Sequence, residues 1–291
     1  MLDLNHLEAF VRIAHRGSFS IAAEELSLTQ PAVSKRVAAL EAGLDTPLFD
    51  RIGRSIQLTE AGRTLLPRAE QILARIEDSR RAVRNLAGQV EGPLKVGTSH
   101  HIGLQRPPPV LRSLVGRYPD VELDLRFLDS EVILAEVEHG QTELGLATLP
   151  PVAPETMACR PIWTDQLVVV VAPGHALSDA TEVKFEHLAR ERAILPGEGT
   201  YTRRIIERAL QPLGINLRVT LATNYLETIK MMVSVGLGWS VLPLGMVDAD
   251  VAVLPVPELR IHRTLGTVHH RERTLSNASR ALMDMLKGHS D

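Results

Sequence analysis

Residues 18–58 read SFSIAAEELSLTQPAVSKRVAALEAGLDTPLFDRIGRSIQL. The pattern predicts two helices joined by a tight turn, followed by a two-stranded hairpin. Thr29 and Pro31 indicate where the second helix begins, because threonine caps helix N-termini and proline is tolerated in the first helical turn. The apolar residues that follow recur at helical spacing and form one stripe: Val33, Val37, Leu40 and Leu44.

The opposite face of this second helix is short, polar and singly basic. It carries Gln30, Pro31, Ser34, Lys35 and Ala38. A DNA major groove admits an α-helix and is read by side chains of this kind, and the small residues let the backbone lie deep in the groove. The alternative is an ordinary solvated helix face, and this face by itself does not decide between the two.

The hairpin after this helix carries two arginines. Pro47 favours an extended entry, and Gly53 provides the turn between two short strands that end at Leu58. Arg51 and Arg54 fall near the tip, where they suit backbone phosphates or a neighbouring minor groove. The alternative is that these arginines serve solubility.

The composition is that of a globular protein with two or three domains. The chain has 291 residues, of which 44% are hydrophobic and 23% charged, and its formal net charge is −3. DNA binding therefore has to rest on locally placed cations. The single cysteine, Cys159, excludes an internal disulfide and a cysteine-rich zinc site. The chain shows neither a signal-peptide pattern nor a run of about 18 apolar residues, so we expect a cytoplasmic protein without a membrane partner.

Short motifs follow one another from residue 7 to residue 62: LeuGluAlaPhe, GlySerPheSer-x-AlaAla-x-x-Leu, ThrGlnProAlaValSer, LeuGlu, ProLeuPhe-x-Arg and LeuThr-x-AlaGly. In this spacing the chain resembles the LysR-type transcriptional regulators. The resemblance implies a winged helix-turn-helix DNA-binding domain over residues 1–58. Asp45 stands where family members commonly have glycine. Aspartate tolerates the left-handed conformation better than most residues, so we expect an intact helix end there.

A long helix is predicted from Thr59, its N-cap, to about residue 87. Its apolar and small positions keep a heptad seam, while charged residues crowd the other faces. A seam this narrow favours pairing with a second copy, and the alternative is packing onto its own domain. The family resemblance implies a dimerising linker helix and a tetramer built from two such dimers. The seam consists of Leu65, Ala69, Ile72, Ile76, Val83 and Leu86.

Residues 88–93 read as a hinge, and an alternation of strands and helices follows it to residue 291. The chain is therefore α/β overall, after an all-α winged N-terminal part. The expected strands are 94–97, 121–127, 143–147, 167–172, 193–195, 217–222 and 239–242, and the expected helices are 109–117, 130–139, 201–213 and 224–235.

The resemblance implies that residues 94–291 form an effector-binding domain similar to periplasmic solute-binding proteins. Two crossover strands, near residues 161–164 and 265–269, would join its two subdomains. The first subdomain would hold about 94–162 and 269–291, and the second about 163–268.

Hydroxyl and amide side chains follow three of the expected strands. In open α/β sheets, ligands bind beyond the carboxyl ends of strands, where helix N-termini present free N–H groups. Such groups suit a carboxylate or a small oxyanion as the effector. The alternative for each of them is a helix cap. The candidate effector-binding residues are Thr98, Ser99, His100, His101, Thr148, Gly199, Thr200, Thr202 and Asn224.

Neither metal nor enzyme chemistry is indicated. His100–His101 and His269–His270 are adjacent pairs whose members point in different directions, and no carboxylate at metal-ligand spacing accompanies them. The chain lacks a nucleophile elbow, a zinc-protease motif and a phosphate-binding glycine loop. We therefore expect no metal, no cofactor and no catalytic residue.

We interpret the chain as a sequence-specific transcriptional regulator that responds to a small, anionic effector. Two alternatives remain: a cytosolic small-molecule binding protein without regulatory DNA binding, and an enzyme on a binding-protein scaffold. The expected partners are double-stranded operator DNA, the effector, further copies of the chain and RNA polymerase. Gln30, Pro31, Ser34 and Lys35 are expected to read bases, and Arg36, Arg51 and Arg54 to hold phosphates.

Overall fold

The computed structural model describes residues 3–52, 55–178, 180–188, 190–213 and 217–289. They divide into two compact units, residues 1–87 and residues 88–291. In the described part of the chain, none of the helices is long and apolar enough to cross a membrane.

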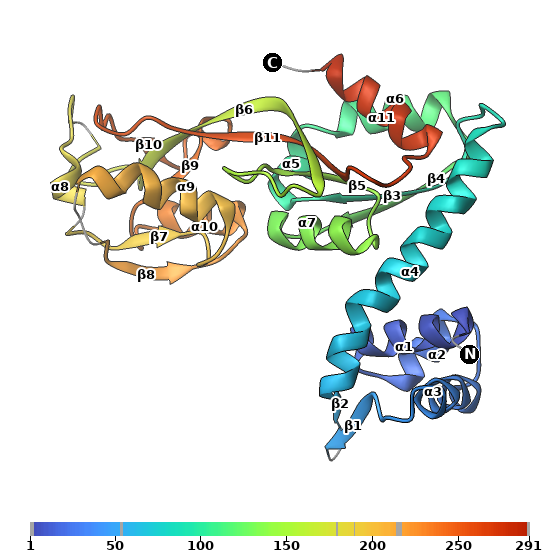
Figure 1. Cartoon of the computed structure of the whole chain (residues 1–291). Coiled ribbons are helices and arrows are strands. Elements are labelled where there is room, and N and C mark those ends of the chain that lie inside the picture. Colours follow the sequence, from blue (N-terminus) through green and yellow to red (C-terminus); the bar gives the residue numbers. More distant parts are fainter. Residues whose placement is uncertain (1–2, 53–54, 179, 189, 214–216, 290–291) are drawn as a thin grey trace. The chain divides into compact units, whose positions relative to one another are not determined.

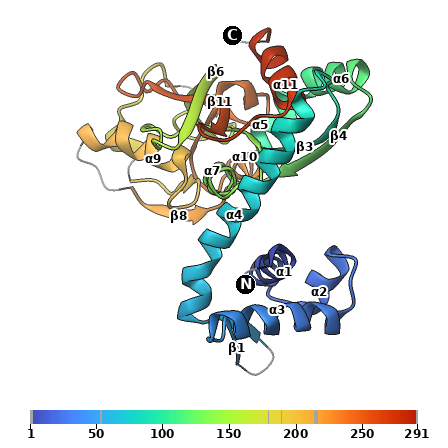
Figure 2. The same cartoon turned by 45° about the vertical axis from the view of Figure 1, so that its right-hand side comes forward.

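Three short helices and a hairpin build the first unit (Figures 1 and 2): α1 (Leu4–Arg16), α2 (Phe19–Glu25), α3 (Gln30–Leu44), β1 (Phe49–Ile52) and β2 (Ser55–Leu58). Ser18 and Thr29 cap α2 and α3, because their side-chain oxygens accept from the Ile21 and Ala32 N–H groups. The predicted second helix and its cap are therefore confirmed.

Asp45 ends α3 in the left-handed conformation, at φ 51° and ψ 36°. The expectation of an intact left-handed end at this position is confirmed. The hairpin is confirmed as well, since Phe49 pairs with Leu58 and Asp50 with Gln57 in an antiparallel register. Its tip, Gly53 and Arg54, lies outside the described residues.

The long helix α4 runs from Glu60 to Asn85, and Thr59 caps it by accepting from the Gly62 N–H. Ala69 is fully buried in the core of its own unit, together with Leu7, Phe10 and Leu40. Ala69 is thus unavailable to a partner helix, and its assignment to the dimer seam is wrong. The heptad pattern could not separate the two roles, because one apolar stripe serves both of them along this helix.

The remaining seam residues are more accessible. Ile72 is 38% exposed, Val83 68% and Leu86 85%, while Leu65 and Ile76 are partly buried. The first half of α4 therefore packs on its own unit, and the later seam positions present apolar side chains on the helix surface.

The second unit is built around one mixed sheet. Its strand order is β10-β6-β11-β5-β3-β4, and β9 also pairs with β6. The strands are β3 (Gly92–Thr98), β4 (Val121–Phe127), β5 (Leu144–Thr148), β6 (Met157–Val171), β9 (Ser240–Pro243), β10 (Ala252–Val253) and β11 (Ile261–His270).

Two long strands, β6 and β11, pair antiparallel from Ile261–Leu167 to His270–Met157. They run through both lobes of the unit and join them (Figure 1). A bulge interrupts their register between Leu265 and Gly266. Gly266 lies so close to its partner that a Cβ would come within 2.1 Å of the Arg160 carbonyl oxygen, so a larger residue would force the crossover apart.

Helices cover both faces of the first lobe, which consists of β3–β5 and the helices around them (Figure 1). Leu114 of α6 and Leu282 of α11 share a core with Val96 and Leu146 of the sheet. On the other face, Ile133 and Val137 of α7 pack against Ala147 and Val268. The helices are α5 (His100–Gln105), α6 (Pro108–Arg117), α7 (Ser130–His139) and α11 (Asn277–Lys287).

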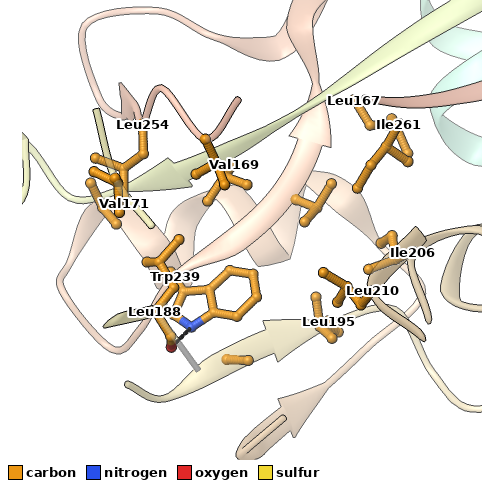
Figure 3. Packing of buried hydrophobic residues seen from close by; sticks show 14 residues of the cluster. Leu167, Val169, Val171, Leu188, Leu195, Ile206, Leu210, Trp239, Leu254 and Ile261 are labelled. Atoms are coloured by element: carbon orange, nitrogen blue, oxygen red, sulfur yellow. Dashed lines mark hydrogen bonds between the residues drawn. The ribbon is translucent and has the colours of Figure 1, made fainter. Parts of the chain in front are cut away.

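The second lobe holds β7–β10 with the helices between them. Figure 3 shows its core, in which Trp239 packs among Val169, Val171, Leu195 and Leu254. The indole Nε1–H donates to the Leu188 carbonyl oxygen at 2.9 Å, so the buried ring keeps its polar group bonded. The remaining elements are α8 (Phe185–Leu188), β7 (Ala193–Leu195), α9 (Tyr201–Leu210), η1 (Gln211–Leu213), β8 (Val219–Ala222), α10 (Leu226–Ser234) and η2 (Leu244–Met246).

Most expected elements of this unit are present within a few residues, and some details differ. Residues 100–105 form the short helix α5, which was not among the expected helices. One strand, β6, covers residues 157–171 instead of starting at 167. The helix α11 was not predicted, although Ala278, Leu282, Met283 and Leu286 carry the apolar stripe that buries it.

Candidate functional site

The outer face of α3 presents the predicted base-reading residues. Gln30, Pro31 and Lys35 are exposed, and Ser34 and Arg36 are partly buried. Val33 and Val37 on the other face are buried against α1 and α2. The helix therefore shows a polar, singly basic surface to its surroundings. The Arg51 side chain and all of Arg54 lie outside the described residues.

Glu41 fixes the hairpin relative to α3, a role that the motif alone did not indicate. Its Oε1 accepts from the Leu48 N–H at 2.7 Å and from the Phe49 N–H at 3.3 Å. Phe49 also stacks near Phe10 and Phe19, with ring centroids 5.4 Å and 5.9 Å apart. A carboxylate that accepts two N–H groups and an aromatic contact hold the two parts of the winged fold in one geometry.

In the second unit, helix starts from both lobes meet at one junction. Asn224, just before α10, donates through Nδ2 to Oδ2 of Asp129 at 2.6 Å, and its own Oδ1 accepts from the Gly197 N–H. The Glu131 carboxylate of α7 accepts from the Tyr201 N–H, the first of α9. N–H groups of the second lobe thus donate hydrogen bonds to carboxylates of the first lobe and connect the two lobes.

A ring contact adds to these connections. The His100 ring lies 5.3 Å from the Phe127 ring and 5.0 Å from the Tyr225 ring, centroid to centroid. His100 and Tyr225 are exposed, so this contact lies at the surface of the junction.

Beneath the junction lies a buried charged group. Arg263 of β11 is 4% exposed and donates through Nε and Nη2 to Oδ2 of Asp165 at 2.8 Å and 2.7 Å. Its Nη1 donates to the Thr202 hydroxyl at 3.2 Å. Both charges are removed from water, so each depends on the other for its stability.

His101 belongs to the same buried group. Its Nε2 is 3.8 Å from Oδ2 of Asp165, and its Nδ1 is 3.8 Å from Oε1 of Glu227. Burial, together with the Arg263 charge, lowers the pKa of His101 to about 4, so the ring is neutral at neutral pH. Its Nδ1 is buried without a hydrogen-bond partner among the described residues.

Glu131 is held in an environment that disfavours its charge. Burial raises the pKa of Glu131 above its ordinary value, although the Tyr201 N–H opposes this shift. Its carboxylate occupies the start of α9, where the partial positive charge of the helix favours an anion. The Glu131 carboxylate of the first lobe is thus the same kind of group, a carboxylate, that the sequence analysis expected in the effector.

The predicted effector-binding residues other than Gly199 divide into three groups. Thr98 is 0% and Thr148 3% exposed, so both are internal. Thr200 caps α9, since its hydroxyl accepts from the Arg203 N–H and donates to the Gly197 carbonyl, which is the helix-cap alternative. The residues brought to the junction are His100, His101, Thr202 and Asn224. Ser99 directly precedes His100 as the N-cap of α5.

The Ser99 side chain makes no cap hydrogen bond with α5, whereas the Thr200 side chain caps α9. Gly199 is exposed at φ 87°, a backbone conformation that glycine adopts readily. It shapes the loop before α9.

Sequence reasoning missed five charged residues at the junction: Asp129, Glu131, Asp165, Glu227 and Arg263. The first two follow a strand that the sequence did identify, so the rule of polar residues beyond strand ends could have found them. Arg263 and Asp165 are 98 residues apart and lie inside strands. No local pattern pairs them.

Comparison with known proteins identifies the family. Residues 4–63 match the family described as bacterial regulatory helix-turn-helix protein, lysR family, and residues 87–291 match the LysR substrate binding domain. The chain belongs to the LysR family. It is a transcriptional regulator with a helix-turn-helix DNA-binding domain followed by an α/β effector-binding domain.

Relatives named as transcriptional regulators match nearly all or part of the chain. A probable RuBisCO transcriptional regulator from Synechocystis is 31% identical over 290 residues, which span 96% of this chain and 84% of the relative. An uncharacterised HTH-type transcriptional regulator from Azotobacter vinelandii is 62% identical over 108 residues, 37% of this chain and 75% of the relative.

Solved structures share the fold. A full-length OxyR variant from Pseudomonas aeruginosa has a TM-score of 0.73 at 24% identity and covers 99% of this chain and 95% of its own. Full-length CbnR complexed with its target DNA has a TM-score of 0.67 at 20% identity. The match covers 99% of this chain and 100% of the CbnR chain. At these identities the likeness concerns the fold.

Proposed function

We propose that this LysR-family regulator reads its operator with the outer face of α3 and senses a small anion at the junction of its two lobes. Gln30, Pro31, Ser34 and Lys35 read bases in the major groove. Arg36, Arg51 and Arg54 hold phosphates on either side. The exposed, singly basic face of α3, opposite its buried stripe, supports this assignment.

The anion competes with the chain's own Glu131. The observation that carries this proposal is the Glu131 carboxylate at the first N–H of α9, since a bound carboxylate or oxyanion would take the same position. Ser99 and the free Nδ1 of His101 offer further hydrogen bonds to such a ligand. Displacing Glu131 releases one connection between the lobes and changes their arrangement.

This change reaches DNA through the oligomer. Two copies pair along the α4 seam through Leu65, Ile72, Ile76, Val83 and Leu86, and two pairs form the tetramer. A ligand that favours one lobe arrangement over another shifts the tetramer by its differential affinity for the two, and so shifts the spacing of the winged domains. The protein acts in the cytoplasm, without a catalytic reaction, and works with RNA polymerase at the promoter.

A thermal-shift screen of small carboxylates and oxyanions on the full chain tests the ligand site. Ser99→Ala should weaken a hit by roughly three- to tenfold, because one hydrogen bond to a charged ligand is lost. The matched control is Ser113→Ala, which removes an exposed hydroxyl on α6 that donates to the Pro109 carbonyl. If Ser99→Ala and Ser113→Ala both bind the hit with wild-type affinity, the ligand does not lie at this junction and the proposal fails.

A further inference from the structure

A cavity lies in the effector-binding domain beside the junction and shares only Arg263 with the junction residues. It has a volume of about 550 Å³ and opens between α9, the start of β11 and the loop that follows β5. This size falls within the usual range of small-ligand sites. Its lining residues are Leu149, Pro150, Pro151, Ala153, Cys159, Pro161, Ile205, Arg208, Ala209, Arg260, Ile261, His262, Arg263 and Thr264.

The charged residues that line this cavity are all basic. Arg208, Arg260 and Arg263 line it, and none of the described lining residues is a carboxylate. Arg263 is neutralised by Asp165 at 2.7 Å. Arg208 and Arg260 are exposed, and neither forms an ion pair with a carboxylate of the described residues. Two guanidinium groups at one opening, with no acid of their own, fit an oxyanion head group.

A neighbouring hollow extends the basic surface. It shares Pro150, Pro151 and Arg208 with the cavity and adds Tyr201 and Arg204. Arg204 lies 4.6 Å from the centroid of the Tyr201 ring. The acid of this hollow, Glu207, is bonded to Arg203 at 2.6 Å, so its charge is already compensated.

The remaining walls of the cavity are apolar. The space behind the arginines is enclosed by apolar residues: Leu149, Pro150, Pro151, Pro161, Ile205 and Ala209. Burial raises the pKa of Cys159, so its thiol stays uncharged at neutral pH and adds to this apolar lining. The cavity thus combines a cationic opening with an apolar interior.

We propose that this cavity is a second ligand site, for a small organic anion that carries an oxyanion head on an apolar body. Arg208 and Arg260 bind the head, and the prolines with Ile205 and Ala209 enclose the body. The site is distinct from the junction site proposed above, because its binding residues, Arg208, Arg260, Ile205 and Ala209, take no part in the junction, and Arg263 alone borders both. Arg263 is left unchanged in the test, since its loss would leave Asp165 buried without a partner.

The test is a calorimetric titration of the full chain with phenyl phosphate and, separately, with inorganic phosphate. Phenyl phosphate should bind the wild type more tightly than inorganic phosphate, because only its ring reaches the apolar walls. Arg208→Gln/Arg260→Gln should weaken phenyl phosphate binding by about tenfold or more. Arg112→Gln/Arg117→Gln, which removes two arginines of α6, should stay within about twofold of the wild type and controls for net charge.

Two further variants separate this site from others. Ala209→Phe, which fills the cavity without changing charge, should weaken phenyl phosphate binding as well, and it keeps the test decisive if the double variant does not fold. Ser99→Ala should leave this binding unchanged. The proposal is overturned if the wild type does not bind phenyl phosphate, if both arginine pairs weaken it equally, or if the cavity variants bind like the wild type. Loss through Ser99→Ala alone would place the ligand at the junction and would also overturn it.

Discussion

The two units of this regulator differ in how many polar side chains they bury. Among the described residues, the first unit buries Glu70 and Asp78, both on α4, while its helix-turn-helix keeps its polar side chains at the surface. The effector unit buries many more, including His101, Asp165 and Arg263 close to the lobe junction. The proposed DNA-reading surface is thus local and exposed, whereas the proposed sensing region depends on buried charges from distant parts of the chain.

This difference predicts different responses to substitution. A residue on an exposed reading face affects DNA affinity and leaves folding nearly unchanged. A buried charge affects folding strongly, because its partner remains behind without water. Three substitutions test the comparison, and they follow from the largest expected effect to the smallest.

Arg263→Met should lower the free energy of unfolding of the effector unit by about 3–5 kcal/mol, because Asp165 is left buried and unpaired. Urea unfolding followed by circular dichroism measures the loss. Arg12→Met, which removes an ion pair with Glu25 between partly exposed side chains, should cost under about 1 kcal/mol. Arg263→Met/Asp165→Leu should recover most of the stability. A double variant as unstable as the single one would contradict this account of the pair.

Lys35→Ala should weaken specific operator binding by roughly 1–3 kcal/mol if Lys35 contacts a guanine, with little change in thermal stability. Fluorescence anisotropy with operator and random duplexes measures the two affinities at one salt concentration. Arg112→Ala in the effector unit is the matched control. An equal loss on both duplexes would make Lys35 a phosphate contact and remove it from base reading.

Lowering the pH from 7.5 to 5 should destabilise the wild type relative to His101→Gln by about 2 kcal/mol. The pKa of His101 is lowered to about 4 in the fold, so its contribution is present above the unfolded value near 6.5 and is lost as the pH falls toward 4. Denaturant unfolding of both proteins at both pH values gives the difference, and other titrating groups cancel. Equal losses in the two proteins would show that His101 is not held neutral.

The same contrast explains how far sequence reasoning reached. In the winged unit the decisive signals are local: Thr29 and Thr59 cap the helices they precede, and Asp45 ends α3 in the left-handed conformation. Each acts on backbone within a few residues, so it can be recognised in the chain itself. Ala69 was misassigned because an apolar stripe looks the same in sequence whether it packs on its own unit or on a second copy.

In the effector unit the rule about strand ends placed Asn224 and Thr202 correctly at the junction. It did not find Arg263, whose role depends on its ion pair with Asp165 on the other crossover strand. Thr98 and Thr148 follow the same rule and yet are internal, since their burial is set by the whole first lobe. Polar residues beyond strands can thus be predicted as a set, while the role of each depends on contacts far apart in sequence.

The most direct test of the sensing mechanism is the affinity of Glu131→Ala for the strongest anion found in the screen, measured by calorimetry. Because the chain's own carboxylate no longer occupies the start of α9, the anion should bind about tenfold or more tightly than to the wild type. Glu138→Ala on the same helix, whose carboxylate bonds Thr156, should bind like the wild type. Unchanged or weaker binding by Glu131→Ala would contradict the competition between Glu131 and the effector.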